Sequence, residues 1–186
     1  MEARETRLPG ALVLVPTVHH DDRGFFQETY RRDDFARLGL TDEFVQENHS
    51  RSTRGVVRGM HLQVGEGIAK LVRCARGEIL DVIVDVRRGS PTYGGWEAFA
   101  LDDRDHHQVY VPVGFAHGFC VLSDVADVVY RQSGYYAPTL ERSIAYDDPR
   151  IGIEWPAGLE LTVSARDRAA PPLDELAAEL PFSFDA

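Results

Sequence analysis

The sequence predicts an all-β protein, either a sandwich or a small barrel. About ten short apolar runs recur along the chain at regular spacing, and residues typical of turns separate them. Helical periodicity is convincing in one short segment of the first half, so the chain lacks the alternation of strand and helix that builds a parallel βαβ sheet. At 186 residues the chain is long enough to bury a core, and we expect one domain spanning residues 1–186.

The first predicted elements are short. The run Leu12-Val13-Leu14-Val15 is typical of a strand, and Asp21-Asp22-Arg23-Gly24 is a turn that leads into a strand over 25–30. A helix over 31–38 ends at Gly39, a residue that commonly follows the last helical turn.

Strands dominate the rest of the chain. The dipeptide Arg76-Gly77 predicts a tight hairpin between two of them, and one short helix is predicted within the tail from Pro171 to Leu180. The predicted strands cover residues 44–50, 56–63, 68–75, 78–86, 96–101, 108–112, 117–122 and 126–132.

Composition excludes several classes of partner. A formal net charge of −10 argues against nucleic acid and against an anionic membrane surface, although a local arginine cluster can still bind a small anion. Cys74 and Cys120 lie in apolar runs and form no disulfide pattern. The polar segment Met1 to Pro9 is no signal peptide, and no apolar run reaches the ~20 residues of a membrane span. We therefore expect a cytoplasmic protein.

Lys70 is the single lysine of the chain, against nineteen arginines. It opens the apolar stretch Lys70-Leu71-Val72-Arg73-Cys74, which is typical of a buried strand, where an unpaired cation is costly. An ammonium is a compact point charge that can stabilise negative charge developing on one oxygen, unlike the broad guanidinium fork. This contrast indicates a chemical role for Lys70, although chance in a lysine-poor chain is the simpler alternative.

A dense motif runs from Pro112 to Phe119 and contains His117. This PxGxxH pattern resembles the second half of the cupin signature, in which such a histidine binds a metal inside a jelly roll. The alternative is that His117 is a hydrogen-bonded core residue.

The corresponding first half of the signature is incomplete. His61 is present, but Gln63 stands where a second histidine ligand is expected, and Glu66 comes too early for the carboxylate ligand. Lys70 occupies the region of that carboxylate, and a cation repels a metal ion. The sequence therefore predicts a barrel that has kept its cavity without a metal.

Without a metal, His61 and Lys70 can still carry out proton chemistry. Neutral imidazole is a suitable general base near neutral pH when a carboxylate holds it in one tautomer. Lys70 can stabilise an enolate oxygen, and Tyr130 ends a strand predicted to run through the same barrel. Amphipathic packing is the alternative explanation for Tyr130.

Taken together, the ordered motifs resemble those of the dTDP-4-dehydrorhamnose 3,5-epimerase family. The resemblance covers nearly the whole chain. The matching segments are residues 23–28, 46–50, 55–63, 70–73, 81–87, 89–94, 112–122, the strand of Tyr130, residues 135–138 with Glu141, residues 147–149 and residues 153–156.

The resemblance implies a cupin jelly-roll barrel, a homodimer, and double epimerisation of dTDP-4-dehydro-6-deoxy-D-glucose without metal or cofactor. His61 would be the base, paired with Asp167. Lys70 would stabilise the enolate oxygen on carbon 4, and Tyr130 would return a proton from the opposite face. Asp167 is a candidate through the resemblance alone, since spacing does not single it out.

Further polar residues would hold the nucleotide sugar by the same resemblance. They are Arg23, Glu28, Gln46, Asn48, Arg58, His117, Glu141 and Arg166. Arg166 stands where relatives usually have lysine, which suggests that this position needs only a positive charge near the phosphates. Taken alone, Arg23 is also explained as a turn residue and Glu28 as an outward strand position.

Three other functions stay open from the sequence. The first is epimerisation at carbon 3 or carbon 5 alone, by a relative with the same histidine, lysine and fold. The second is a metal-dependent cupin, an oxygenase or isomerase, and the third is a barrel that binds sugar without catalysis. The intact set of His61, Lys70 and Tyr130 disfavours the third.

Overall fold

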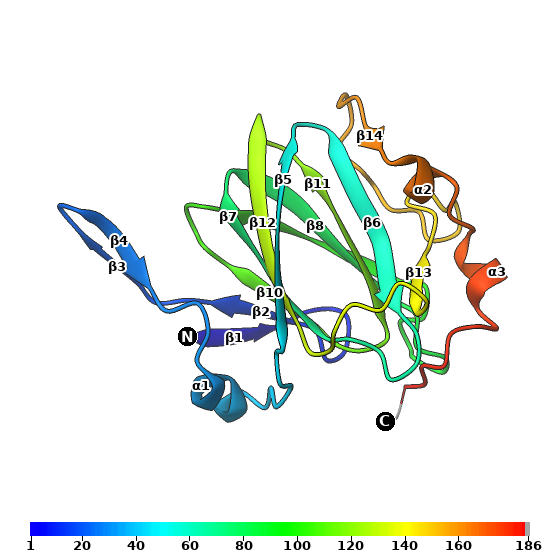
Figure 1. The fold of residues 1–186 in the computed structure, drawn as a ribbon, viewed down its shortest axis with the longest axis horizontal. Helices are drawn as coiled ribbons and strands as arrows, with labels where there is room; N and C mark the ends of the chain where they lie inside the picture. The colour runs from blue at the N-terminus through cyan, green and yellow to red at the C-terminus, as the bar shows by residue number, and fades with distance from the viewer. Residues whose placement is uncertain (185–186) are drawn as a thin grey trace.

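The computed structural model describes residues 1–184. Two antiparallel β-sheets face each other, and a separate hairpin projects from one side (Figure 1). The first sheet has the strand order β1-β2-β10-β7-β12-β5. Its strands are β1 (Glu2–Glu5), β2 (Leu12–Val15), β10 (Gln108–Val111), β7 (Lys70–Arg76), β12 (Val125–Gln132) and β5 (Gln46–Thr53).

The second sheet has the order β13-β6-β11-β8-β9. Its strands are β13 (Glu141–Ser143), β6 (Val56–Gln63), β11 (Phe115–Val121), β8 (Glu78–Asp85) and β9 (Trp96–Asp102). A short strand, β14 (Thr162–Val163), pairs parallel to β6. Strands that follow one another in the chain often belong to different sheets. Most residues that contact each other are therefore far apart in the sequence.

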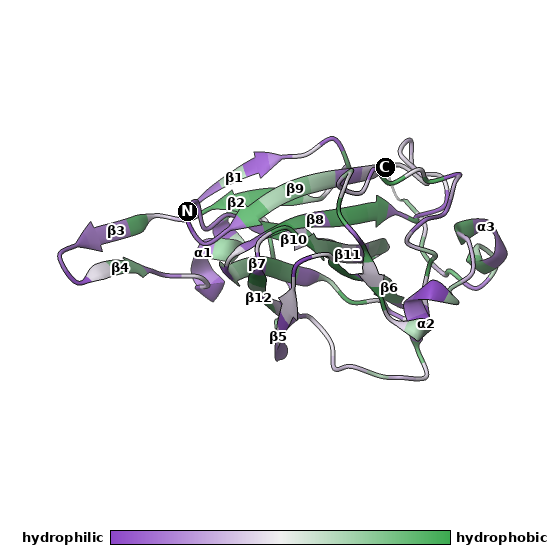
Figure 2. Ribbon diagram, turned by 90° about the horizontal axis from the view of Figure 1, so that it is seen from above, coloured by the Kyte–Doolittle hydropathy of each residue, from purple (hydrophilic) through white to green (hydrophobic). Residues whose placement is uncertain are grey.

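The core lies between the two sheets. Val72 on β7 and Val128 on β12 pack there with Ile83 on β8 and Phe119 on β11, and each is at most 4% exposed. β8 is apolar on both faces because its outer side is covered as well: Val82 and neighbouring residues pack against the C-terminal segment. Figure 2 shows this as the hydrophobic colouring of β8 and β11. Burying both faces favours the β-branched residues that form these strands.

Two peripheral parts flank the sheets. The hairpin of β3 (Val18–Asp21) and β4 (Gly24–Gln27) extends away from the body, followed by α1 (Arg32–Arg37) (Figure 1). At the opposite end lie α2 (Ala165–Arg168) and α3 (Leu173–Leu176). Among residues 1–184, no helix is long and apolar enough to cross a membrane.

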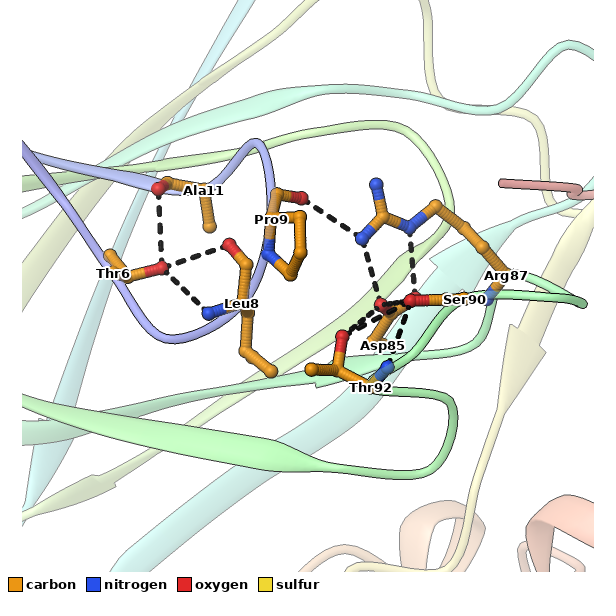
Figure 3. Close-up of polar contacts among 8 residues, drawn as sticks. All are labelled: Thr6, Leu8, Pro9, Ala11, Asp85, Arg87, Ser90 and Thr92. Carbon is orange, nitrogen blue, oxygen red and sulfur yellow. Dashed lines mark hydrogen bonds and ion pairs between the residues drawn. The ribbon is translucent and has the colours of Figure 1, made fainter. Parts of the chain in front are cut away.

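A buried polar cluster ties the N-terminal loop to the end of β8 (Figure 3). Asp85 is fully buried and accepts hydrogen bonds from Ser90, Thr92 and both Nε and Nη2 of Arg87, at 2.5–2.9 Å. Arg87 also donates to the carbonyl oxygen of Pro9 at 2.9 Å. A buried carboxylate is stable only when its lone pairs are satisfied, as they are here.

The all-β class and most of the predicted strands are confirmed. β6 has the predicted bounds, α1 is shorter than predicted, and α3 is the short helix predicted in the tail. The tight hairpin predicted at Arg76-Gly77 is wrong, because β7 and β8 meet there but belong to different sheets. The predicted strand over 25–30 is wrong in extent: it ends at Gln27, and its partner β3, which we did not predict, forms the hairpin. The edge strands β1, β13 and β14 were also not predicted, because their residues carry no apolar alternation.

Candidate active site

A cavity of about 640 Å³ opens between the two sheets. Ten of the twelve residues proposed from the sequence line it, namely Gln46, Asn48, Arg58, His61, Lys70, His117, Tyr130, Glu141, Arg166 and Asp167.

His61 forms a dyad with Asp167. Nε2 of His61, on β6, lies 2.7 Å from Oδ1 of Asp167, on α2. Ser164 caps this helix, since its hydroxyl accepts the backbone N–H of Asp167 at 3.0 Å. Burial raises the pKa of Asp167, but hydrogen bonds from His61, Ser164 and the backbone of Gly59 outweigh burial and lower it. An ionised Asp167 accepts a hydrogen bond from the Nε2–H of His61, and the proton stays on Nε2. Nδ1 of His61 is then the basic nitrogen.

Lys70 begins β7 and is 8% exposed. Its Nζ donates to the carbonyl oxygen of His61 at 3.2 Å, so the ammonium bridges from the first sheet to β6. Burial lowers the pKa of Lys70 to about 8, and the nearby charges of Asp81 and Glu141 partly offset this effect. The sequence-based prediction of a buried cation is confirmed.

His117 lies directly opposite His61 in the β11–β6 pair. Nε2 of His117 is 2.7 Å from Oδ1 of Asp81, and both residues are buried. Burial lowers the pKa of His117, despite the neighbouring Asp81. His117 therefore stays neutral near neutral pH, with its orientation fixed by Asp81.

Tyr130 faces the cavity from the first sheet, opposite the dyad. Its strand, β12, runs between β5 and β7, and Tyr130 is half-buried. Burial and the charge of Glu141 raise the pKa of Tyr130, while Arg58 and a hydrogen bond from Asn48 act in the other direction. A phenol in this setting stays protonated at neutral pH, as a proton donor must.

The rim of the cavity carries a charged cluster. Glu141 accepts hydrogen bonds from the hydroxyl of Tyr136 at 2.7 Å and pairs with Arg166 at 2.6 Å. Burial raises the pKa of Glu141, but the contacts with Tyr136 and Arg166 outweigh it and lower the pKa. Arg166 and Arg58 give this part of an acidic protein two exposed guanidinium groups, which suit phosphate oxygens.

Arg23 and Glu28 do not line the cavity of their own chain. Arg23 lies at the tip of the hairpin with its side chain 90% exposed, paired with Asp21 at 2.5 Å. Glu28 follows β4 and pairs with Arg31 at 2.6 Å. Two aromatic side chains on the same hairpin, Phe25 and Phe26, are 54% and 72% exposed.

Some residues of the site were not predicted. Asp81 supports His117 from behind the cavity wall, and Gln132 bonds to both Gln46 and Asn48. Asp81 carried the same sequence signal as Lys70, an ionisable residue within an apolar strand. Gln132, at a strand end, gave no comparable signal.

No group of three or more His, Cys, Asp or Glu residues within the described part of the chain could hold a metal ion. The two histidine–carboxylate pairs instead use one nitrogen of each ring for an aspartate.

Comparison with known proteins agrees with this arrangement. The family model for dTDP-4-dehydrorhamnose 3,5-epimerase matches residues 5–175. The enzyme of that name from Salmonella typhimurium is 47% identical over 173 residues, which are 92% of this chain and 94% of the relative. The chain belongs to the dTDP-4-dehydrorhamnose 3,5-epimerase family. As a member of this family it is an isomerase, an epimerase acting on carbohydrates.

Solved structures of relatives superpose closely on this member of the family. A 3,5-epimerase from Legionella pneumophila, in complex with dTDP-4-keto-L-rhamnose, gives a TM-score of 0.96 at 42% identity, covering 100% of this chain and 99% of that one. A 3′-monoepimerase from Streptomyces bikiniensis, in complex with dTDP-quinovose, gives 0.88 at 38% identity, covering 94% and 89%. The predicted cupin-like jelly-roll fold is thereby confirmed.

Proposed function

We propose that residues 1–186 form one epimerase domain that converts dTDP-4-dehydro-6-deoxy-D-glucose to dTDP-4-dehydro-L-rhamnose by inverting carbons 3 and 5. The observation that carries the proposal is the cavity, which His61 lines from the second sheet and Tyr130 from the first. Asp167 on α2 holds His61, and Lys70 reaches from the first sheet to the backbone of His61. Removal of a proton from one face of a carbon and return of a proton to the other face inverts that carbon.

The proposed proton transfers use each of these groups in turn. Nδ1 of His61 takes the proton from the carbon next to the ketone, and the C–H electron pair moves to form an enolate with its negative charge on the carbon 4 oxygen. Lys70 stabilises that oxygen. The hydroxyl of Tyr130 then protonates the same carbon from the opposite side, and the ketone re-forms. His61 and Tyr130 then exchange protons with solvent, and the same steps repeat at the second carbon.

The diphosphate and nucleotide would be held by the exposed polar groups around the cavity. Arg58 and Arg166 supply positive charge, and Gln46 and Asn48 line the wall of the same cavity. No metal or cofactor is needed, since the substrate ketone itself acidifies the protons at both carbons.

We further propose a homodimer in which the hairpin of one protomer reaches the cavity of its partner. This arrangement accounts for Arg23 and Glu28, which lie outside the cavity of their own chain, and for the exposed phenylalanines beside them. An extended hairpin with two exposed aromatic side chains is typical of an interface, because such a surface is costly in water.

Mixed dimers test this arrangement. A chain carrying Arg23→Ala and Glu28→Ala is combined with a chain carrying His61→Asn after unfolding and refolding together. If the hairpin serves the partner's cavity, each mixed dimer has one complete site, and activity returns to about one quarter of the wild-type level for random pairing. Each variant alone remains inactive. No recovery in verified mixed dimers would contradict the exchange of hairpins.

The function itself is tested by proton exchange. The protein is incubated with dTDP-4-dehydro-6-deoxy-D-glucose in deuterated water, and carbons 3 and 5 are followed by NMR. We expect deuterium at both positions. Deuterium at one position alone would instead assign a monoepimerase, the activity of the structurally similar Streptomyces bikiniensis enzyme. No deuterium from folded protein would refute epimerisation of this substrate.

A further inference from the structure

Gln132 is the centre of a row of amide side chains on the wall of the cavity. It lies opposite Gln46 in the β12–β5 pair and opposite Lys70 in the β12–β7 pair, and it is 5% exposed. Its Oε1 accepts two hydrogen bonds, from Nε2 of Gln46 at 3.1 Å and from Nδ2 of Asn48 at 2.8 Å. Nε2 of Gln46 also donates to Oδ1 of Asn48 at 3.0 Å.

The direction of these hydrogen bonds is fixed at one end by the backbone. The N–H of Tyr136 donates to Oε1 of Gln46 at 2.9 Å, and a backbone N–H can act only as a donor. Gln46 must therefore turn its NH₂ group toward Asn48 and Gln132. Both of those residues must then present their oxygens to Gln46, and Asn48 must direct its own NH₂ group elsewhere.

The other end of the row is Tyr130. Asn48 and Tyr130 are directly opposite each other in the β5–β12 pair. A hydrogen bond from the Asn48 side chain lowers the pKa of Tyr130, against the larger effect of burial, which raises it. A phenol oxygen that accepts a hydrogen bond from Asn48 must point its own proton in another direction, and Tyr130 lines the cavity.

We propose that Gln132 is a positioning residue for the reaction: by accepting both amides on Oε1, it holds Asn48 so that Nδ2 donates to the Tyr130 oxygen and the phenol proton faces the substrate. The inference rests on the proposed role of Tyr130 as the proton donor. The same hydrogen bond stabilises the phenolate that forms when Tyr130 gives up its proton. Gln132 itself need not touch the reacting carbons.

The test compares Gln132→Met with a matched control, Gln108→Met. Methionine keeps the length of the side chain and removes the acceptor. Gln108 is 2% exposed, and its amide donates to the carbonyl oxygen of Thr29, away from the cavity. The side-chain amide signals of Asn48 are recorded by ¹⁵N–¹H NMR at neutral pH, and kcat and KM are measured on the same samples.

Of the two Asn48 amide protons, one is bonded to Gln132 and loses its acceptor directly in Gln132→Met. We expect the other, which faces Tyr130, to move upfield as well, as it does alone in a Tyr130→Phe reference. We expect kcat to fall by about 10- to 100-fold, the factor for one hydrogen bond to a developing charge, with KM nearly unchanged. The control should move neither the Asn48 signals nor kcat. The proposal would be overturned if the Asn48 proton that faces Tyr130 stays in place in Gln132→Met, or if it moves while kcat is unchanged.

Two further variants keep the result interpretable. Gln132→Glu retains an acceptor and should keep the Asn48 signals near their wild-type positions, which a simple packing defect would not predict. If Gln132→Met fails to fold, the Tyr130→Phe spectrum still tests the hydrogen bond from Asn48 to Tyr130. Asn48 signals that do not move in Tyr130→Phe would refute that hydrogen bond. Full activity of Tyr130→Phe would refute the proton donor role while leaving the amide geometry measurable.

Discussion

Replacement of Lys70 by methionine should reveal how much free energy the protein spends to keep a charge in its cavity. The pKa of Lys70 is lowered from 10.5 to about 8 by burial. At about 1.4 kcal/mol per pKa unit, this difference corresponds to about 3 kcal/mol between the two protonation states. The side chain is 8% exposed, so water screens little of this cost.

The sign of the effect follows from which state holds the proton. Between pH 8 and pH 10.5, residue 70 is mostly neutral in the folded protein and mostly protonated in the unfolded chain. Because the unfolded state binds more protons there, the free energy of unfolding rises with pH across this window. Relative to Lys70→Met, which does not titrate, wild-type stability should increase by up to about 3 kcal/mol between neutral pH and about pH 10.

The measurement is urea denaturation of both proteins at a series of pH values. The charge of Lys70 lowers the pKa of His117, but the window from pH 8 to 10.5 lies above the titration of histidine. Within that window, the difference between the two free energies of unfolding therefore reports on Lys70. A difference that stays constant across the series would refute the reasoning, because it would mean that Lys70 keeps its ordinary pKa in a well-hydrated cavity.

The same residue should be essential for activity. Removal of one preorganised donor from a developing oxyanion typically costs about 10²–10³ in kcat, which we expect for Lys70→Met. Lys70→Arg should be nearly as damaging, because the guanidinium fork does not fit the place of a compact ammonium. Near-full activity of Lys70→Arg would contradict the role inferred from the single lysine.

Substitutions at three other residues test separate parts of the molecule. Asp167→Asn should lower kcat by about 10²–10⁴ with little change in KM, because His61 loses the carboxylate that fixes its tautomer; an unchanged kcat would exclude the dyad. Arg166→Lys should keep KM within about threefold, while Arg166→Gln should raise it about tenfold by removing a phosphate contact; equal KM values would argue against that contact. Asp85→Ala should lower the free energy of unfolding by about 3–5 kcal/mol in urea denaturation, since Arg87 loses its buried partner; a loss below about 1 kcal/mol would contradict this.

Strands were predictable where their own residues carry the apolar pattern. β6 and β12 alternate or run as apolar segments, and turn residues mark their ends. β1 has the sequence Glu-Ala-Arg-Glu, which carries no strand signal, and it is held by pairing with β2 at a sheet edge. β14 is two residues long and depends on its parallel contact with β6. Such elements exist because of long-range pairing, which a local pattern does not contain.

Some residues of the site could be predicted from the sequence and others could not. Lys70 follows from the cost of burying a cation, a physical rule that applies to one residue at a time. Asp167 lies 106 residues from His61 in the sequence, and its place beside that histidine depends on how α2 packs against β6. Resemblance to a family supplied Asp167, while spacing did not. Gln132 acts through two other side chains, so nothing at its own position indicates a role.

The division of groups between the two sheets bears on why relatives can differ in specificity. If the proposed roles hold, the His61 dyad on the second sheet and Tyr130 on the first act on opposite faces of whichever carbon lies between them. The proton-transfer groups then do not select the carbon, since they are the same for both positions. Selection must come from how the sugar can turn in the cavity, and therefore from the rim formed by Tyr136, Glu141 and Arg166. We expect exchange of these rim residues, and not of the proton-transfer groups, to convert a double epimerase into a single one.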